Sequence, residues 1–209
     1  MVPMAKCDKV LDSDMQDIIR QLMNRTPFRK QVMMFSATLS EKRQLDYKKW
    51  MVNPKIILVD EGKLVLHGLT QFYLRVPEEQ KFERLILLLD TLAFNQVIIF
   101  TNRVDREERI KNYDLFKSNS SRLLVATDLF GRGIDIERVN LVINYDFPPD
   151  RDTYLHRVGR AGRFNTRGLA INFLRGEGGD DEAVLKDVQN GFQVKIEELP
   201  NEIDPMKFM

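Results

Sequence analysis

Short apolar runs that alternate with amphipathic stretches are the feature of this sequence that most constrains its fold. Several of the runs are continuous and rich in β-branched residues, as in strands covered on both faces. We predict six buried strands: Val32–Phe35, Phe72–Val76, Val97–Phe100, Leu123–Ala126, Leu141–Asn144 and Leu169–Phe173. The alternation predicts an α/β fold with a parallel sheet and helices on both faces.

Three helices are expected between these strands. Glu78–Ala93 has helical periodicity, with an inner face formed by Phe82, Leu85, Leu89 and Leu92. Glu107–Lys117 is a second candidate, and a third begins at Asp152 or Thr153, directly after two prolines. Residues 177–182 (EGGDDE) are predicted to form an acidic loop.

Composition excludes several classes of site. The net charge is +1 over 209 residues, so overall charge gives no argument for a nucleic-acid partner. Cys7 is the only cysteine, which excludes an internal disulfide and a cysteine-based zinc site. His67 and His156 lie far apart in the sequence, so we expect no metal site formed by this chain. No apolar stretch approaches the roughly 20 residues that cross a membrane.

The pattern changes near residues 55–70. Before this point we expect one strand between two helices, the second of which carries Lys48, Lys49 and Trp50. Fewer than 60 residues with one good strand are too few for a core of their own. We therefore expect residues 1–57 to be the tail of a domain whose beginning is missing. Residues 58–69 would be a linker and 70–209 a complete α/β domain.

The first candidate ligand loop is Thr127–Asp135 (TDLFGRGID), which follows a predicted strand. In open α/β sheets, ligands meet the loops at the carboxyl ends of strands. Gly131 allows close backbone approach to an anion, Arg132 adds positive charge, and the Asp135 carboxylate can accept hydrogen bonds from a ribose. A glycine-rich turn with an internal Arg–Asp pair explains the same residues equally well.

The second candidate is Tyr154–Arg163 (YLHRVGRAGR). On a helix that ends near Gly162, the side chains of His156, Arg160 and Arg163 would share one face. The guanidinium group suits a triphosphate because it donates two parallel hydrogen bonds. The alternative is a set of solvated basic residues at a helix C-terminus.

These two segments, about 20 residues apart, resemble motifs V and VI of superfamily 2 helicases in their DEAD-box form. Ser36-Ala37-Thr38 resembles motif III, and Val97–Phe100 resembles motif IV. The closing segment DVQNGFQVKIEELPNEID is similar to the DEAD-box helicases of splicing and mRNA export. The DEAD-box helicases of translation initiation are the alternative. The resemblance implies a RecA-like parallel sheet in residues 70–209, preceded by a remnant of the first RecA-like domain.

The resemblance also implies roles for individual residues. Arg160 and Arg163 would be arginine fingers that reach the γ-phosphate of ATP, and Asp135 would contact the ribose. The residues expected to couple hydrolysis to domain closure are Ser36, Thr38 and His156. Those expected along the RNA backbone are Arg109, Thr127, Gly131 and Arg132. Arg109 is the weaker match, because Arg106 stands where the family's Q-x-x-R element has glutamine.

The sequence departs from the family in two ways. It contains no G-x-x-x-x-G-K-[ST], and Ala5 and Lys6 occupy positions where the family has the acidic residues of motif II. ATP and Mg²⁺ would therefore bind only with a complete first domain, and we expect this chain alone to be inactive as an ATPase. In addition, comparison with the family pattern predicts that about two dozen residues, the size of one helix and one strand, are missing after Phe100. Either the sheet closes by a different pairing, or the sequence omits a stretch of the protein.

The expected function is thus half of an RNA-stimulated ATPase that acts in splicing or mRNA export. Its partners would be single-stranded or short duplex RNA and proteins of those pathways, with no membrane. We expect a monomer in the nucleus, with the cytoplasm as a second location. A non-catalytic module that binds RNA or proteins is the alternative from a different class.

Overall fold

The chain divides into two compact units, Met1–Leu58 and Val59–Met209. The computed structural model describes residues 2–5, 7, 13–36, 45, 48–58, 68–102, 115, 117–128, 138–162, 166–176 and 179–200. Within these ranges, no helix combines the length and the apolar character needed to cross a membrane.

The first unit contains β1 (Val2–Ala5), α2 (Ser13–Arg25) and β2 (Val32–Phe35). The two strands pair in parallel. Its small core is formed by Met4, Cys7, Ile19 and Met23. β2 was predicted, whereas β1 was missed because its four residues include a proline and lack strand periodicity. In the predicted second helix, Lys48 is helical and the next two residues form a turn.

The second unit is built on a six-stranded sheet in which every neighbouring pair is parallel. The spatial order of the strands is β5-β4-β6-β7-β3-β8. Their bounds are β3 (Leu69–Arg75), β4 (Gln96–Phe100), β5 (Leu123–Ala126), β6 (Val139–Asn144), β7 (Gly168–Leu174) and β8 (Glu197–Glu198). The five longer strands overlap the five predicted here, which confirms the parallel α/β fold.

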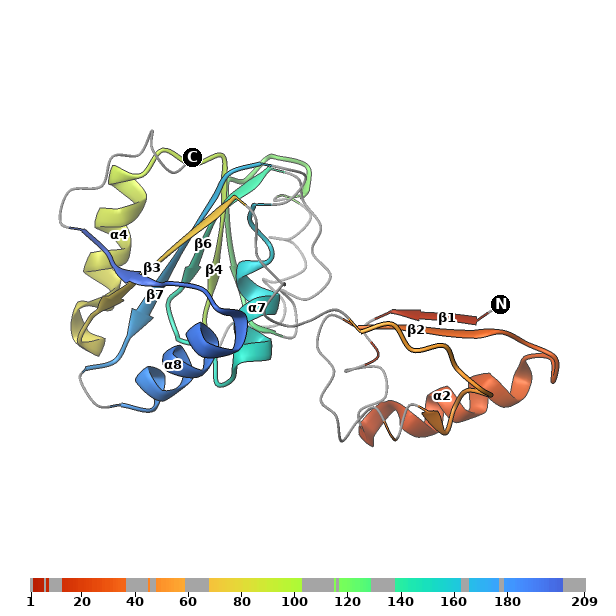
Figure 1. The fold of residues 1–209 in the computed structure, drawn as a ribbon. Helices are drawn as coiled ribbons and strands as arrows, with labels where there is room; N and C mark the ends of the chain where they lie inside the picture. Colours follow the sequence, from red (N-terminus) through yellow and green to blue (C-terminus); the bar gives the residue numbers. More distant parts are fainter. Residues whose placement is uncertain are drawn as a thin grey trace. The chain divides into compact units, whose positions relative to one another are not determined.

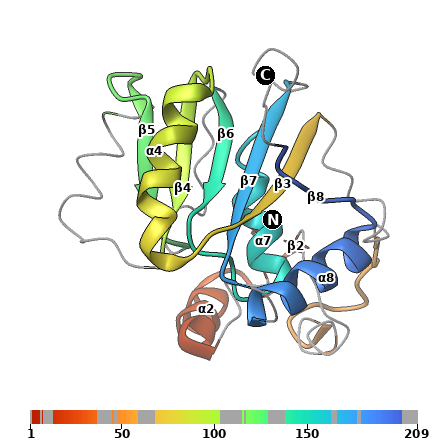
Figure 2. The same cartoon turned by 90° about the vertical axis from the view of Figure 1, so that its left-hand side faces the viewer.

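Helices cover both faces of this sheet (Figure 1). The helical segments are η2 (Glu78–Gln80), α4 (Lys81–Thr91), α7 (Arg151–Val158) and α8 (Asp180–Phe192). α4 lies on one face, where Leu85, Leu88 and Leu92 pack against alternate residues of the strands. α7 and α8 pack on the opposite face (Figure 2). The two buried layers explain why the strands read as continuous apolar runs.

Three predicted helical details were wrong. Phe82 was placed on the inner face of its helix but is 67% exposed, whereas Leu88 is buried. Apolar residues surround most of this helix, so periodicity alone did not identify the inner face. α8 begins at Asp180, inside the predicted acidic loop, and its first turn carries three carboxylates that favour a helix N-terminus. α7 is capped by Asp150 rather than by Asp152 or Thr153.

Strand β5 ends the sheet on one side, as far as the chain is described. It pairs directly with β4, although the two strands are separated by 22 residues of sequence. Leu123 and Val125 are 36% and 37% exposed, while the alternating Leu124 and Ala126 are buried. One face of β5 thus carries apolar side chains that are partly exposed, and the other face is buried. The predicted helix Glu107–Lys117 lies largely outside the described residues.

Candidate functional site

The candidate site lies at the carboxyl ends of β4, β5 and β6, where the two motif-bearing segments begin. Backbone hydrogen bonds join these ends: the Thr101 amide donates to the Ala126 carbonyl at 2.9 Å, and the Asp146 amide donates to the Phe100 carbonyl at 3.2 Å. Ligands of open α/β sheets bind at this edge. The local fold therefore places both candidate loops where a ligand is expected.

Arg157 holds the two segments together. Its guanidinium donates from Nε to Asp128 Oδ1 at 2.5 Å and from Nη2 to Asp128 Oδ2 at 2.8 Å. Nη1 donates to the Asp146 carbonyl at 2.6 Å, and the group lies 5.2 Å from the centroid of the Phe100 ring. The side chain is buried, so a bidentate ion pair here is weakly screened. Arg157 thus links α7 to the loop after β5 and to the strand ends beside it.

A buried lysine supports the same edge from the opposite face. Lys81, at the start of α4, is completely buried, and its Nζ lies 2.8 Å from Glu78 Oε2 and 3.4 Å from Asp146 Oδ1. Asp146 Oδ2 accepts a hydrogen bond from the Asn102 amide at 2.7 Å. Burial, reinforced by the nearby Glu78 carboxylate, raises the pKa of the Tyr145 hydroxyl, whose ring lies beside Lys81. Asp146 therefore fixes the loop after β4 through its side chain and Arg157 through its backbone.

A buried polar network anchors α7 to the sheet. Asn144 Nδ2 donates to Asn172 Oδ1 at 2.7 Å, and Asn172 Nδ2 donates to the Phe72 carbonyl at 2.7 Å. The Tyr154 hydroxyl donates to Gln71 Oε1 at 2.6 Å. Burial raises the pKa of this hydroxyl well above its ordinary value. A fully satisfied network of this kind fixes one orientation of the helix.

The predicted finger Arg160 lies outside the helix. α7 ends at Val158, so the proposed helical face shared by His156, Arg160 and Arg163 is wrong. Gly159 ends the helix because it favours helical geometry less than other residues do. The chain then turns, and Arg160, itself buried, donates from Nε to the His156 carbonyl at 3.0 Å.

The other predicted residues are placed as follows. Thr127 directly follows β5, and its hydroxyl is buried without a hydrogen-bond partner among the described residues. Ser36 follows β2 in the first unit, whereas His156 is in the last turn of α7 in the second. Thr38, Arg109, Gly131, Arg132, Asp135 and Arg163 lie outside the described residues. The described part of the chain contains no group of three metal-ligating side chains.

Sequence reasoning missed the roles of Asp128, Asp146 and Lys81. Asp128 and Asp146 each stand two residues beyond the end of a strand, β5 and β6 respectively. That position was a usable signal, because a parallel sheet places the carboxyl ends of its strands at one edge. Lys81 gave no signal, since a lysine at the start of a helix is normally solvated.

Comparison with known proteins gives the family. The model named Helicase conserved C-terminal domain matches residues 89–165. The chain is 48% identical over 231 residues to the ATP-dependent RNA helicase SUB2 of Debaryomyces hansenii, covering 98% of this chain and 53% of that protein. It is 50% identical over 230 residues to the ATP-dependent RNA helicase uap56 of Schizosaccharomyces pombe, with 98% and 52% covered. The chain thus spans about half the length of the curated relatives it matches.

The length of the SUB2 match also shows how many residues this chain lacks relative to that protein. In the SUB2 comparison, 98% of the 209 residues is about 205, which is about 26 fewer than the 231 residues aligned. The relative therefore carries about two dozen positions that this chain lacks within the matched stretch. This number agrees with the gap expected from the sequence.

Solved structures agree with the family assignment. Saccharomyces cerevisiae Dbp5 bound to RNA and ADP BeF3 matches with a TM-score of 0.85 at 26% identity, covering 95% of this chain and 59% of that one. The C-terminal domain of Dbp5 matches with a TM-score of 0.57 at 27% identity, covering 65% of this chain and 92% of that domain. The sheet and its helices therefore have the RecA-like fold of the helicase C-terminal domain. The chain belongs to the DEAD-box RNA helicases and corresponds to their C-terminal part.

Proposed function

We propose that this chain supplies the second half of an RNA-stimulated ATPase site and depends on a P-loop domain for the first half. The observation that carries the proposal is the Arg157–Asp128 ion pair, which fixes motif VI against motif V at 2.5 and 2.8 Å. A site assembled between two domains needs its contributing loops held in one geometry before the domains close. Both segments meet at the ligand-binding edge of the sheet.

The proposed nucleotide contacts come from motif VI and the end of motif V. Arg160 and Arg163 would hold the γ-phosphate, and Asp135 would hold the ribose. Arg160 directly follows Gly159 after the end of α7, and the bond from its Nε to the His156 carbonyl at 3.0 Å supports this role because it holds the side chain in place. ATP supplies the phosphoryl group when bound, and Mg²⁺ would be held by the complete first domain. Ser36, Thr38 and His156 would couple closure of the two units to hydrolysis.

RNA would bind along the loop after β5. Arg109, Thr127, Gly131 and Arg132 are the proposed contacts, and they would hold phosphates and sugars rather than base edges. The buried hydroxyl of Thr127 supports a role for this position, because an unsatisfied polar group at a site is a candidate for a ligand contact. We therefore expect binding that weakens with salt and shows little base preference.

Relatives named SUB2 and uap56 support a place in mRNA splicing or export. We accordingly propose a nuclear protein that acts as a monomer on single-stranded or short duplex RNA, with splicing or export proteins as partners. The two proteins named here share about half of the aligned residues with this chain. That identity supports a common RNA-dependent role for the shared region.

The test is RNA-stimulated phosphate release by the purified chain, with and without the P-loop domain of a SUB2 relative added in trans. We expect no turnover from the chain alone and measurable turnover from the mixture. Arg163→Ala should reduce that turnover by a factor of about 10³ or more, as for other arginine fingers. Arg167→Ala, four residues away, is the matched control and should retain turnover. Turnover by the chain alone that Arg163→Ala abolishes would overturn the half-site proposal.

A further inference from the structure

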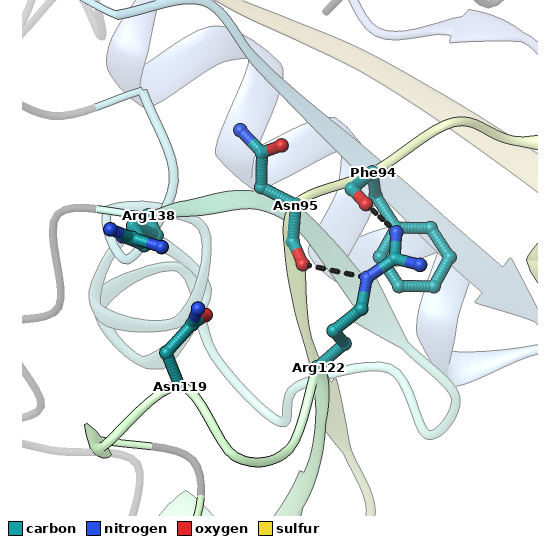
Figure 3. Close-up of a pocket in the computed structure, with 5 residues that line it drawn as sticks. All are labelled: Phe94, Asn95, Asn119, Arg122 and Arg138. Atoms are coloured by element: carbon teal, nitrogen blue, oxygen red, sulfur yellow. Dashed lines mark hydrogen bonds between the residues drawn. The ribbon is translucent and has the colours of Figure 1, made fainter.

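A second candidate site lies at the opposite edge of the same sheet. Asn95, Arg122 and Arg138 each directly precede a strand, β4, β5 and β6 respectively. With Phe94 and Asn119 they line a pocket of about 410 Å³ (Figure 3). β4 is five residues long, so this edge lies roughly 16 Å from the motif V and VI edge. The pocket is therefore separate from the proposed ATP and RNA contacts.

Arg122 is held in place by neutral groups. Its Nε donates to the Asn95 carbonyl at 3.1 Å, its Nη2 donates to the Phe94 carbonyl, and its guanidinium lies 4.8 Å from the centroid of the Phe94 ring. Carbonyl oxygens and an aromatic ring orient the group but do not neutralise its charge. Arg122 is thus a preorganised cation at the wall of the pocket.

Arg138 adds a second positive charge on the other side of the pocket, next to Asn119 (Figure 3). Among the described residues, no carboxylate lies within ion-pair distance of Arg122 or Arg138. Asn119 has a φ of +62°, a conformation that asparagine tolerates, and this fixes the turn that carries its amide. The Asn95 backbone amide donates to Asn140 Oδ1 at 2.9 Å, which holds the pocket floor. The pocket therefore combines amide donors on a fixed frame with two arginines that have no carboxylate partner in the described part of the chain.

We propose that this pocket docks an acidic peptide segment of a protein partner. The two arginines favour an anionic ligand, because no carboxylate in the described part of the chain neutralises them. A carboxylate suits them because guanidinium groups bind it in a bidentate manner. Arginine and aromatic side chains are also enriched at protein interfaces, and Phe94 is the partly buried aromatic residue of this pocket. A phosphodiester chain is disfavoured, because the proposed RNA contacts lie at the opposite edge of the sheet. The preference for a peptide over RNA rests on the proposed RNA contacts, whereas the presence of an anion site does not depend on the proposed ATPase role.

The test is fluorescence anisotropy of a fluorescein-labelled hexaglutamate peptide with the full chain in low-salt buffer. We expect saturable binding that Arg138→Gln weakens about fivefold, the effect of losing one exposed ion pair. Arg122→Gln should weaken it at least as much, and the double substitution should abolish it. Arg167→Gln, an exposed arginine outside the pocket, is the matched control and should bind like the unaltered chain.

Three outcomes would overturn the proposal. The first is binding that is unchanged by Arg138→Gln and Arg122→Gln while the protein remains folded by circular dichroism. The second is displacement by oligouridylate at lower concentration than by unlabelled hexaglutamate, lost with the same substitutions, which would assign the pocket to RNA. The third is complete displacement by inorganic phosphate at a concentration equal to that of the peptide, which would assign it to a small phosphate ligand.

Discussion

Replacing Arg157 by methionine removes the ion pair that joins the two motif-bearing segments. Methionine keeps the length and apolar stem of the side chain, so the change isolates the guanidinium contacts. Those contacts are the two bonds to Asp128, at 2.5 and 2.8 Å, and the bond to the Asp146 carbonyl at 2.6 Å. Each loses its donor in the variant.

The loss of stability in Arg157→Met depends on the Asp128 carboxylate, which stays in place without its partner. Removing one partner of a buried ion pair costs about 3–5 kcal/mol, because the other charge stays unpaired. The Asp128 side chain is 32% exposed, so water solvates part of its charge and the cost of the unpaired charge falls to about 2 kcal/mol. The lost bond to the Asp146 carbonyl adds about 1 kcal/mol. We expect the free energy of unfolding of the second unit to drop by about 3 kcal/mol.

The assay is urea denaturation followed by circular dichroism, for the chain, Arg157→Met, Asp128→Asn and the double variant. With a slope of about 2 kcal/mol per molar urea, the midpoint should fall by about 1.5 M. The double variant should be more stable than the sum of the single effects predicts, by at least about 1.5 kcal/mol. Arg175→Met, whose side chain is 61% exposed, is the control and should change stability by less than about 0.5 kcal/mol. Additive effects of Arg157→Met and Asp128→Asn would refute the reasoning.

Three further predictions concern stability alone. Tyrosine in the unfolded chain ionises near pH 10 (about the model-peptide value), whereas burial raises the pKa of Tyr154 in the folded chain. The contribution of this residue to stability is therefore complete below about pH 10 and is lost as the pH rises above that value. Urea midpoints measured on both sides of that pH should differ less in Tyr154→Phe than in the unaltered chain. Asp150→Ala removes the cap of α7 and should cost about 1 kcal/mol in the same assay, with Asp150→Asn close to the unaltered chain. Gly168→Ala should cost about 1–3 kcal/mol, because its Cβ would lie 2.6 Å from the backbone nitrogen of Gly162; a thermal melt as stable as that of the unaltered chain would contradict this.

The sheet of the second unit was predictable because strands that are buried on both faces consist of continuous apolar runs. Val97–Phe100 and Leu141–Asn144 are continuous apolar runs, and each lies within a strand of the structure. The inner faces of the helices were less predictable, because apolar residues also occupy positions that face outward. In α4, apolar residues occupy most positions, and packing rather than periodicity decided that Phe82 faces outward and Leu88 inward. β8 was not foreseeable, since two glutamates form a strand only when β3 offers a free edge.

The candidate site was predictable as two loops but not as a structure. Motif resemblance identified Thr127 and Arg160, and the parallel sheet explains why their segments begin at one edge. The contacts that hold them came from residues without a motif role in the sequence reading, Asp146 and Lys81 above all. A buried lysine is compensated only by partners that the fold assembles, here from Glu78 and Asp146. Lys81 and Asp146 are 65 residues apart in the sequence, so their pairing has no local sequence signature.

Arg157 and Arg160, two arginines of motif VI, differ in their position and in their contacts. Arg157 is buried, with its guanidinium satisfied by Asp128, the Asp146 carbonyl and the Phe100 ring. Arg160 comes after the helix has ended, and its Nε donates to the His156 carbonyl at 3.0 Å. Because the helix stops at Val158, Arg160 lies on a turn between Gly159 and Gly162 and not on a helical face. Arg157 thus fixes the base of that turn. We therefore expect the proposed contact between Arg160 and a nucleotide held by another domain to depend on the Arg157–Asp128 ion pair.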